Sequence, residues 1–122
     1  ADLRAVMKSV TKYSDNTGGG SNTASYVTAT TDWLFLLAEF EYHGSRSYAN
    51  SAEQNYQQQY AYYQAGNSKV HYRHDNTGTA VHAWCRSVNA SYSGIFCRVF
   101  TDGTAYYTGA DYSWAVAPGF AT

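Results

Sequence analysis

Charged side chains are scarce in this chain. Asp, Glu, Lys and Arg make up 14% of the 122 residues, and the net charge is −1. No basic run marks a nucleic-acid footprint, and no stretch approaches the ~20 apolar residues that cross a bilayer. A signal-peptide pattern is also missing. The composition therefore argues against a nucleic-acid partner and against membrane insertion.

Cysteine is equally rare. Cys85 and Cys97 are too few for a disulfide framework or a zinc site, so they either pair across neighbouring strands or stay as two buried thiols. The histidines between residues 71 and 82 match no metal-binding spacing. We therefore expect no metal and no cofactor, with a calcium ion bound by Asp/Asn loops as the alternative.

Tyrosine, by contrast, is abundant: the chain has 13 Tyr against 5 Phe and 3 Trp. A core alone favours Leu, Ile, Val and Phe. Tyr mixed with Ser, Gly and Asn is typical of binding surfaces, where Tyr supplies contact area at a low entropic cost. The alternative is that these tyrosines line the core with their hydroxyl groups at its edge. The composition favours a binding module over an enzyme and does not name the ligand.

The spacing of apolar residues predicts two helices. Asp2 can cap the first, whose apolar stripe over residues 3–13 is expected to be core. The second opens with a capping box over residues 51–54 and ends at Gly66. Its expected packing face consists of Ala52, Tyr56, Tyr60 and Tyr63. Between the two helices, residues 17–23 form a Gly-rich loop that matches no nucleotide-binding motif.

Residues 33–37 read as a buried strand, followed by a turn or short helix that ends at Gly44. Glu39 and Glu41 in this turn are the only close acidic pair. A glycosidase-like acid/base pair is one interpretation. The favoured interpretation is that one carboxylate lies at a helix start and the other is a buried partner for an arginine.

The C-terminal part is predicted to be β. Residues 69–73 read as an exposed strand and residues 74–79 as a loop. Further strands are predicted over residues 81–87, 95–100, 105–108 and 114–120, with a hairpin turn at Asp102-Gly103. Alternation along residues 95–100 places Arg98 and Phe100 on the displayed side. Phe96 shares that parity but is expected to be buried at the strand's start.

Four motifs in this part resemble a known family when they are taken together. They are Trp84-x-Arg86-Ser87, Phe96-Cys97-x-Val99, Asp102-Gly103-x-Ala105 and Val116-Ala117-Pro118-Gly119-Phe120. They resemble bacterial and phage domains with a C-type-lectin-like fold, in the formylglycine-generating-enzyme-like branch. Residues 34–39 and 48–50 are also similar, so the resemblance runs from about Leu3 to the C-terminus.

The resemblance implies an α+β, C-type-lectin-like fold with two helices, small twisted antiparallel sheets and long loops. Residues 1–122 then form a single domain, which is either complete or the C-terminal part of a longer protein. Ala83 and Cys85 depart from the family, which usually has Trp and Leu at these positions.

Many such domains are diversified by retroelements that mutate adenines in codons near the C-terminus. The resemblance therefore implies that residues 82–116 are a variable-region-like segment of a non-catalytic receptor-recognition domain. Its partner is expected to be a protein or glycan on a cell or phage surface, which places the domain on a phage virion or a bacterial cell surface. The implied ligand-binding residues are Tyr92, Gly94, Ile95, Arg98, Phe100, Tyr106, Tyr107, Thr108, Asp111, Tyr112 and Trp114.

Other positions in this part are expected to be scaffold: Trp84, Arg86, Phe96, Val99, Gly103, Pro118 and Phe120. No residues match the cysteine pair with which formylglycine-generating enzymes work, so no catalytic residue is expected. Two alternatives stay open. One is an enzyme of the formylglycine-generating type, and the other is a structural virion or surface module whose tyrosines make oligomer contacts.

Overall fold

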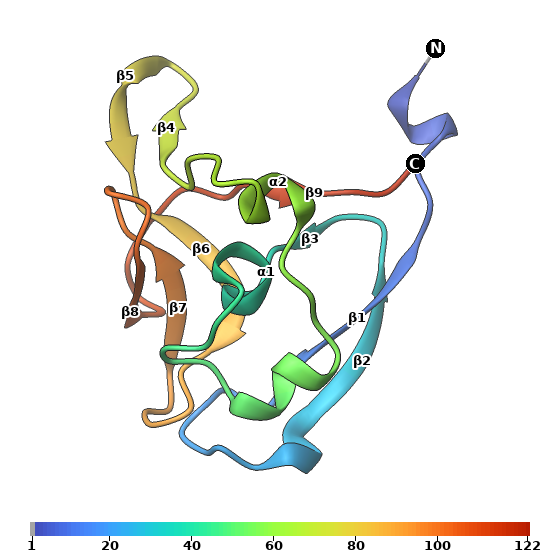
Figure 1. Ribbon diagram of the computed structural model, residues 1–122, viewed down its shortest axis with the longest axis vertical. Helices are drawn as coiled ribbons and strands as arrows, with labels where there is room; N and C mark the ends of the chain where they lie inside the picture. The colour runs from blue at the N-terminus through green and yellow to red at the C-terminus, as the bar shows by residue number, and fades with distance from the viewer. Residues whose placement is uncertain (1) are drawn as a thin grey trace.

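The computed structural model describes residues 2–122, in which small antiparallel sheets surround two short helices, α1 (Glu39–His43) and α2 (Ala61–Gln64) (Figure 1). The described residues also contain three short 3-10 helices: Leu3–Ala5 before β1, Ala24–Tyr26 between β1 and β2, and Ser51–Asn55 between α1 and α2. The strands are β1 (Val10–Asp15), β2 (Val27–Asp32), β3 (Phe35–Leu36), β4 (His71–Arg73), β5 (Asn76–Val81), β6 (Ala83–Val88), β7 (Ile95–Val99), β8 (Ala105–Gly109) and β9 (Pro118–Gly119). The predicted α+β class, with short helices and small sheets, is confirmed.

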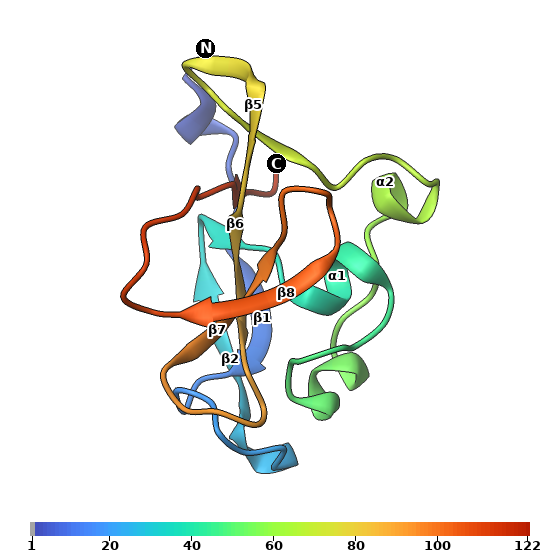
Figure 2. The ribbon, with the colours of Figure 1, turned by 90° about the vertical axis from the view of Figure 1, so that its left-hand side faces the viewer.

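The strands form four antiparallel sheets. β1 pairs with β2, β3 with β9, and β4 with β5, while β6, β7 and β8 form a three-stranded sheet in that order. The β3–β9 pair joins distant parts of the chain, with Phe35 opposite Gly119. Figure 2 shows α1 on one side of the three-stranded sheet and the segment that follows β8 on the other. The three-stranded sheet is therefore the central layer of the domain.

The core lies between this sheet and α1. Its buried cluster consists of Leu37, Tyr42, Ala49, Ala83, Cys85, Cys97 and Val99. Cys85 and Cys97 are free thiols, as one of the two alternatives predicted, and burial raises the pKa of both. The small side chains of Ala83 and Cys85 leave room for the Tyr42 ring, which is 1% exposed.

The predicted N-terminal helix is wrong. Asp2 does cap a helix, because its carboxylate accepts a hydrogen bond from the Arg4 amide, but this 3-10 helix ends at Ala5. Leu3 and Val6 are 48% and 50% exposed, so the predicted stripe is not core. Residues 10–15 instead form β1, which is fully paired with β2. Pairing with a distant strand prevails over a helical spacing that local sequence alone suggests.

The second predicted helix is broken into two pieces. Asn50, and not Ser51, caps the 3-10 helix, and α2 starts only at Ala61. The capping box of Ser51 and Gln54 does not form, because Asn50 Oδ1 accepts the hydrogen bond from the Ala52 amide and the Ser51 amide donates to Asn22 Oδ1. The predicted stop at Gly66 is confirmed, since this residue has a φ of 88° and its amide bonds the Tyr63 carbonyl.

Two strand predictions and one loop prediction also need correction. The strand over residues 33–37 shrinks to Phe35–Leu36, and Trp33 and Leu34 are each 57% exposed. The predicted loop over residues 74–79 contains the start of β5, because β4 and β5 form a tight hairpin. The strand over residues 114–120 is reduced to Pro118–Gly119. The helix end at Gly44, with a φ of 69°, and the hairpin turn at Asp102-Gly103 are as predicted.

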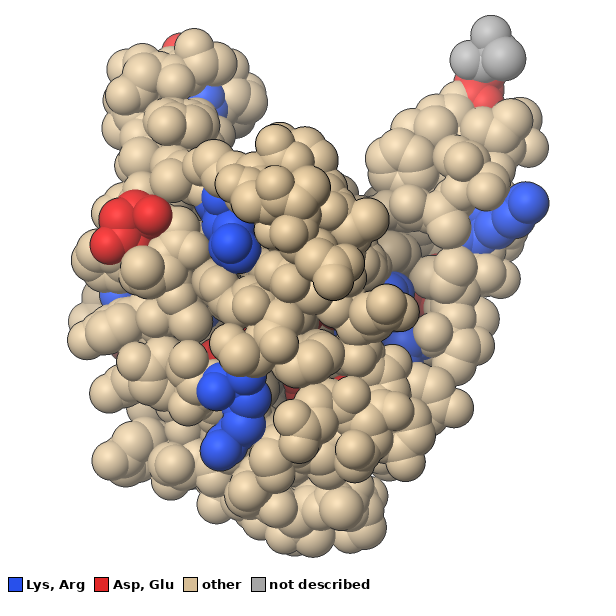
Figure 3. All heavy atoms as spheres, in the orientation of Figure 1, with Lys and Arg blue, Asp and Glu red and all other residues tan. Residues whose placement is uncertain are grey.

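Charges are spread thinly over the surface. Figure 3 shows isolated Lys, Arg, Asp and Glu side chains on a face that other residues otherwise cover. No helix among residues 2–122 has the length and apolar character needed to cross a membrane.

Candidate functional site

Strand register places one row of large side chains on the side of the three-stranded sheet that faces away from α1. Arg98 on β7 lies between Trp84 on β6 and Tyr106 on β8. Cys97 and Val99, the neighbours of Arg98 in sequence, point to the buried core instead. We call this side the outer face. Its residues are His82, Trp84, Phe96, Arg98, Phe100, Tyr106, Tyr112 and Trp114.

Three aromatic rings enclose the Arg98 guanidinium. Its central carbon lies 5.5 Å from the centroid of the Phe100 ring and 5.1 Å from those of Tyr106 and Trp114. The rings also support one another, because Phe100 meets Tyr106 edge-on at 5.5 Å. His82 closes the cluster, with its ring 4.8 Å from Phe100 and 4.4 Å from Trp114. The cluster holds a cation against aromatic faces, an attractive arrangement.

Arg98 has no anionic partner in the part of the chain that the structure describes. The residue is 8% exposed, and its Nε atom is buried without a hydrogen-bond partner. No carboxylate among residues 2–122 forms an ion pair with it. Burial lowers the pKa of Arg98, because desolvation disfavours the charged form. Arg98 is therefore a largely buried cation flanked by aromatic rings, and of its guanidinium nitrogens only Nε is both buried and unpartnered.

Two hollows flank the aromatic cluster. One has a volume of about 510 Å³ and is lined in part by Leu34, Trp84 and Tyr112. The other, of about 600 Å³, is lined in part by Trp114 and Val116. The Tyr112 and Trp114 rings stack with centroids 5.7 Å apart and planes at 3°, so this pair forms the wall between the hollows. A ligand on the outer face would meet this exposed stack and a hollow on either side.

The structure brings together five of the predicted ligand-binding residues. These are Arg98, Phe100, Tyr106, Tyr112 and Trp114. Thr108 is on the same side of the sheet, opposite Phe96. Arg98 is on the predicted displayed side, but it lies at the bottom of the aromatic cluster rather than at the surface.

The other predicted residues lie elsewhere. Tyr107 is opposite Cys97 on the inner side, where its ring packs on Tyr48 at 4.8 Å. Its ring also stacks on that of Tyr106, with centroids 5.0 Å apart. Ile95 has the same parity as Cys97 and also faces inward. Tyr92 and Gly94 are exposed in the connection between β6 and β7, and Asp111 is exposed in the loop after β8. The outer face therefore excludes Tyr92, Gly94, Ile95 and Tyr107.

Three outer-face residues were not predicted to bind ligand. His82 begins the predicted variable-region-like segment but is not among the predicted ligand-binding residues, and Trp84 and Phe96 are predicted to be scaffold. Trp84 and Phe96 meet edge-on at 6.0 Å, and both line the 510 Å³ hollow. Phe96 is half-buried rather than buried. Its shared parity with Arg98 places it on the outer face. Phe120, another predicted scaffold residue, is 45% exposed.

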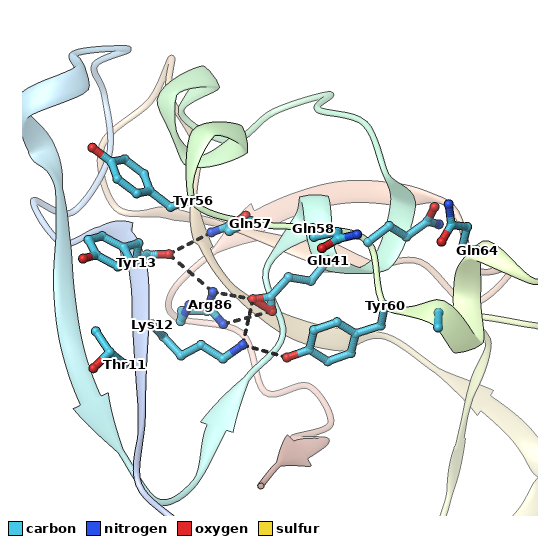
Figure 4. Close-up of a pocket in the computed structure, with 12 residues that line it drawn as sticks. Thr11, Lys12, Tyr13, Glu41, Tyr56, Gln57, Gln58, Tyr60, Gln64 and Arg86 are labelled. Carbon is cyan, nitrogen blue, oxygen red and sulfur yellow. Dashed lines mark hydrogen bonds and ion pairs between the residues drawn. The ribbon is translucent and has the colours of Figure 1, made fainter.

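A separate pocket, which is polar and has a volume of about 420 Å³, lies between β1, α1 and residues 56–64 (Figure 4). At its base, Glu41 Oε1 lies 2.7 Å from Arg86 Nη2 and 3.3 Å from Lys12 Nζ. Lys12 Nζ also donates to the Tyr60 hydroxyl at 2.7 Å. The Glu41 side chain is only 3% exposed. The predicted buried carboxylate–arginine pair is confirmed.

This charge cluster connects four elements, β1, β3, α1 and β6. Arg86 on β6 pairs with Glu41 on α1, and it also donates to the backbone carbonyls of Leu36 and Tyr13. Glu39 accepts hydrogen bonds from the amides of Ser47 and Tyr48. Both carboxylates thus have structural partners, which argues against a glycosidase-like acid/base pair.

Comparison with known proteins assigns the chain to a family. A model of a "Domain of unknown function (DUF6273)" matches residues 1–121. The chain belongs to the DUF6273 family. No curated protein and no solved structure matches it. The function of this DUF6273 domain must therefore be argued from its own site.

The two sites of the DUF6273 domain differ in how their charges are compensated. In the polar pocket, Lys12 and Arg86 share a carboxylate. Both sites hold buried polar atoms without a partner: Arg86 Nε and Gln57 Oε1 in the polar pocket, and Arg98 Nε, Trp114 Nε1 and His82 Nδ1 on the outer face. Among residues 2–122, the arginine of the outer face has no ion pair, whereas Arg86 does. No group of three or more His, Cys, Asp and Glu side chains within residues 2–122 could hold a metal ion. The outer face is therefore the candidate binding site.

Proposed function

We propose that this DUF6273 domain is a non-catalytic recognition domain that binds a protein or glycan through its outer face. The observation that carries the proposal is the buried Arg98, which has no anionic partner and lies among aromatic rings between two hollows. Tyr, Trp and Arg are the residue types that dominate binding energy at interfaces. Tyr106 and Tyr112 are 42% and 57% exposed, so their rings are accessible to a ligand.

The proposal extends to the origin of this surface. We propose a C-type-lectin-like fold in which residues 82–116 are diversified by a retroelement, on a phage virion or a bacterial cell surface. Five of the ligand-binding residues that this interpretation implies lie together on the outer face, which supports the interpretation. The neighbouring DNA tests the reading. It should hold a reverse transcriptase gene and a near-repeat of the segment that differs only opposite adenines, and the absence of both contradicts it.

An enzyme of the formylglycine-generating type has less support. Such chemistry needs a reactive thiolate, and Cys85 and Cys97 are 1% and 0% exposed with raised pKa values. A structural module in which tyrosines join copies of the chain is a separate alternative. Light scattering before and after changing Tyr106 and Tyr107 to Ser distinguishes it, because a loss of oligomers would favour that alternative over ligand recognition.

Binding itself can be tested with paired variants. The immobilised chain would be screened against a phage-displayed random peptide library and an array of bacterial surface glycans. Tyr112→Ser and Trp114→Ser should abolish the binding of the selected probes. Tyr62→Ser is the matched control, because Tyr62 is 61% exposed and packs on Tyr63, outside the outer face. Probes that bind all three variants equally, or no selected probe at all, would refute a recognition role for the outer face.

A further inference from the structure

Arg98 differs in its electrostatic environment from the three arginines that form ion pairs among residues 2–122. Arg4 pairs with Asp2, Arg73 with Asp75, and Arg86 with Glu41. The first two pairs are exposed to solvent, and the third is mostly buried, with only Arg86 Nε left without a partner. Arg98 is buried, yet no side-chain hydrogen bond to it is found among residues 2–122. A buried charge without a partner is costly, and a bound anion would remove that cost.

The groups around Arg98 are suited to bind a hydrogen-bond acceptor. A guanidinium offers five N–H donors in a planar fork that matches the two oxygens of a carboxylate. Trp114 Nε1 is a further donor, buried without a partner, and its ring lies 5.1 Å from the guanidinium carbon. Aromatic walls exclude water, which strengthens any charge-assisted hydrogen bond formed there. The cluster therefore contains more hydrogen-bond donors than hydrogen-bond acceptors.

We propose that the outer face contains a carboxylate-binding subsite at Arg98, filled by an Asp or Glu side chain of a protein partner. The inference rests on the proposed recognition function and names the chemistry of the partner. Because Arg98 is only 8% exposed, the partner must project a narrow group between the rings of Phe100, Tyr106 and Trp114. An acidic side chain is narrow enough and carries the complementary charge.

The rims of the two hollows favour a protein over a glycan. Leu34 and Val116 are 57% and 65% exposed, and each lines one of the hollows. Tyr72, which is 54% exposed, lines the same hollow as Val116. Aliphatic side chains beside Tyr, Trp and Arg provide apolar contact area of the kind that interface centres use. Hydroxyl-rich sugar rings would leave Leu34 and Val116 without a matching surface.

The test compares two blocked tripeptides that differ in one group. Acetyl-Tyr-Glu-Leu-amide and acetyl-Tyr-Gln-Leu-amide would be titrated into the full chain while NMR follows the Trp114 indole N–H. The Glu peptide should bind at least about tenfold more tightly, because a hydrogen bond to a charged group is the stronger one. Arg98→Gln should remove this difference. Arg73→Gln should keep it, because Arg73 is an exposed arginine already paired with Asp75.

Other outcomes would overturn the inference in distinct ways. Equal affinities of the Glu and Gln peptides, both lost in Trp114→Ser, would refute the carboxylate subsite and leave the recognition face standing. Tighter Arg98-dependent binding of methyl glucuronide than of the Glu peptide would refute the protein partner in favour of an acidic glycan. No shift of the Trp114 indole with any of these probes would refute the subsite. Arg98→Met serves as a second variant if Arg98→Gln does not fold.

Discussion

Glu41→Gln should destabilise the domain more than any exposed charge change. Glu41 is the shared carboxylate of Lys12 and Arg86, whose side chains are only 17% and 12% exposed. The substitution keeps the shape of the side chain but leaves two mostly buried cations facing each other. Removing one partner of a buried pair costs about 3–5 kcal/mol, because the remaining charge loses its compensation.

This loss is large compared with the total stability of such a domain. A chain of 122 residues is expected to have a free energy of unfolding of about 6–18 kcal/mol. The unfolding entropy of a domain of this size is about 0.26 kcal/mol per kelvin. A loss of 3–5 kcal/mol therefore corresponds to a fall in Tm of about 12–20 °C.

The matched control is Lys12→Met, which leaves the Glu41–Arg86 pair intact. It removes a 3.3 Å ion pair and the 2.7 Å hydrogen bond to the Tyr60 hydroxyl. We expect a cost of about 1–2 kcal/mol, because hydrogen bonds to charged groups contribute modestly on balance. Urea unfolding followed by circular dichroism measures both variants. If Glu41→Gln costs no more than Lys12→Met, water in the pocket screens these charges and the burial argument fails.

Three further predictions concern other parts of the molecule. Arg98→Met should change Tm by only a few degrees in the absence of ligand, because three aromatic contacts of about 0.5–2 kcal/mol each roughly offset the several kcal/mol that desolvation of the cation costs. A fall as large as that expected for Glu41→Gln would mean that Arg98 is structural. Burial lowers the pKa of His43 from 6.5 to about 4, so stability should be lost as the pH falls from 6.5 towards 4, where the unfolded chain binds the proton more tightly. His43→Gln should flatten that loss in a pH series of Tm, while the exposed control His74→Gln should not. Cys85 and Cys97 should both resist an aromatic disulfide reagent until urea unfolds the chain, and rapid labelling of the native protein would contradict their burial.

The hairpin of β7 and β8 is predictable because its signals are local. The Asp102-Gly103 turn fixes the pairing of β7 with β8, and alternation along β7 separates Cys97 from Arg98. Both features lie within fifteen residues of sequence. The helix stop at Gly44 is equally local, since a glycine tolerates a φ of 69° at the end of α1.

The N-terminal half is mispredicted because its structure depends on distant partners. Val10–Asp15 becomes a strand through pairing with β2, and the helical spacing of Leu3 and Val6 has no packing partner to stabilise it. Ser51 and Gln54 read as a capping box, yet Asn50 caps this helix and the Ser51 amide donates to Asn22, 29 residues earlier. Local patterns cannot show which of two partners a side chain will take.

The candidate site is predictable only where its signals are local. Alternation finds the side of β7 that carries Arg98, and it would also have found Phe96. It cannot show that Trp114, after β8, folds back over that strand, or that Tyr107 turns inward onto Tyr48. The polar pocket escapes sequence reasoning because Lys12, Glu41 and Arg86 are far apart in the chain.

The most direct test of a recognition role for the outer face is one selection experiment run on two proteins. A phage-displayed random peptide library would be selected in parallel against the wild-type chain and against Trp114→Ser. The Tm of each protein would first be measured to show that both are folded at the selection temperature. The outer-face account predicts sequence-specific enrichment on the wild-type chain alone. The same peptides enriched on both proteins would contradict it and move the binding site away from Trp114.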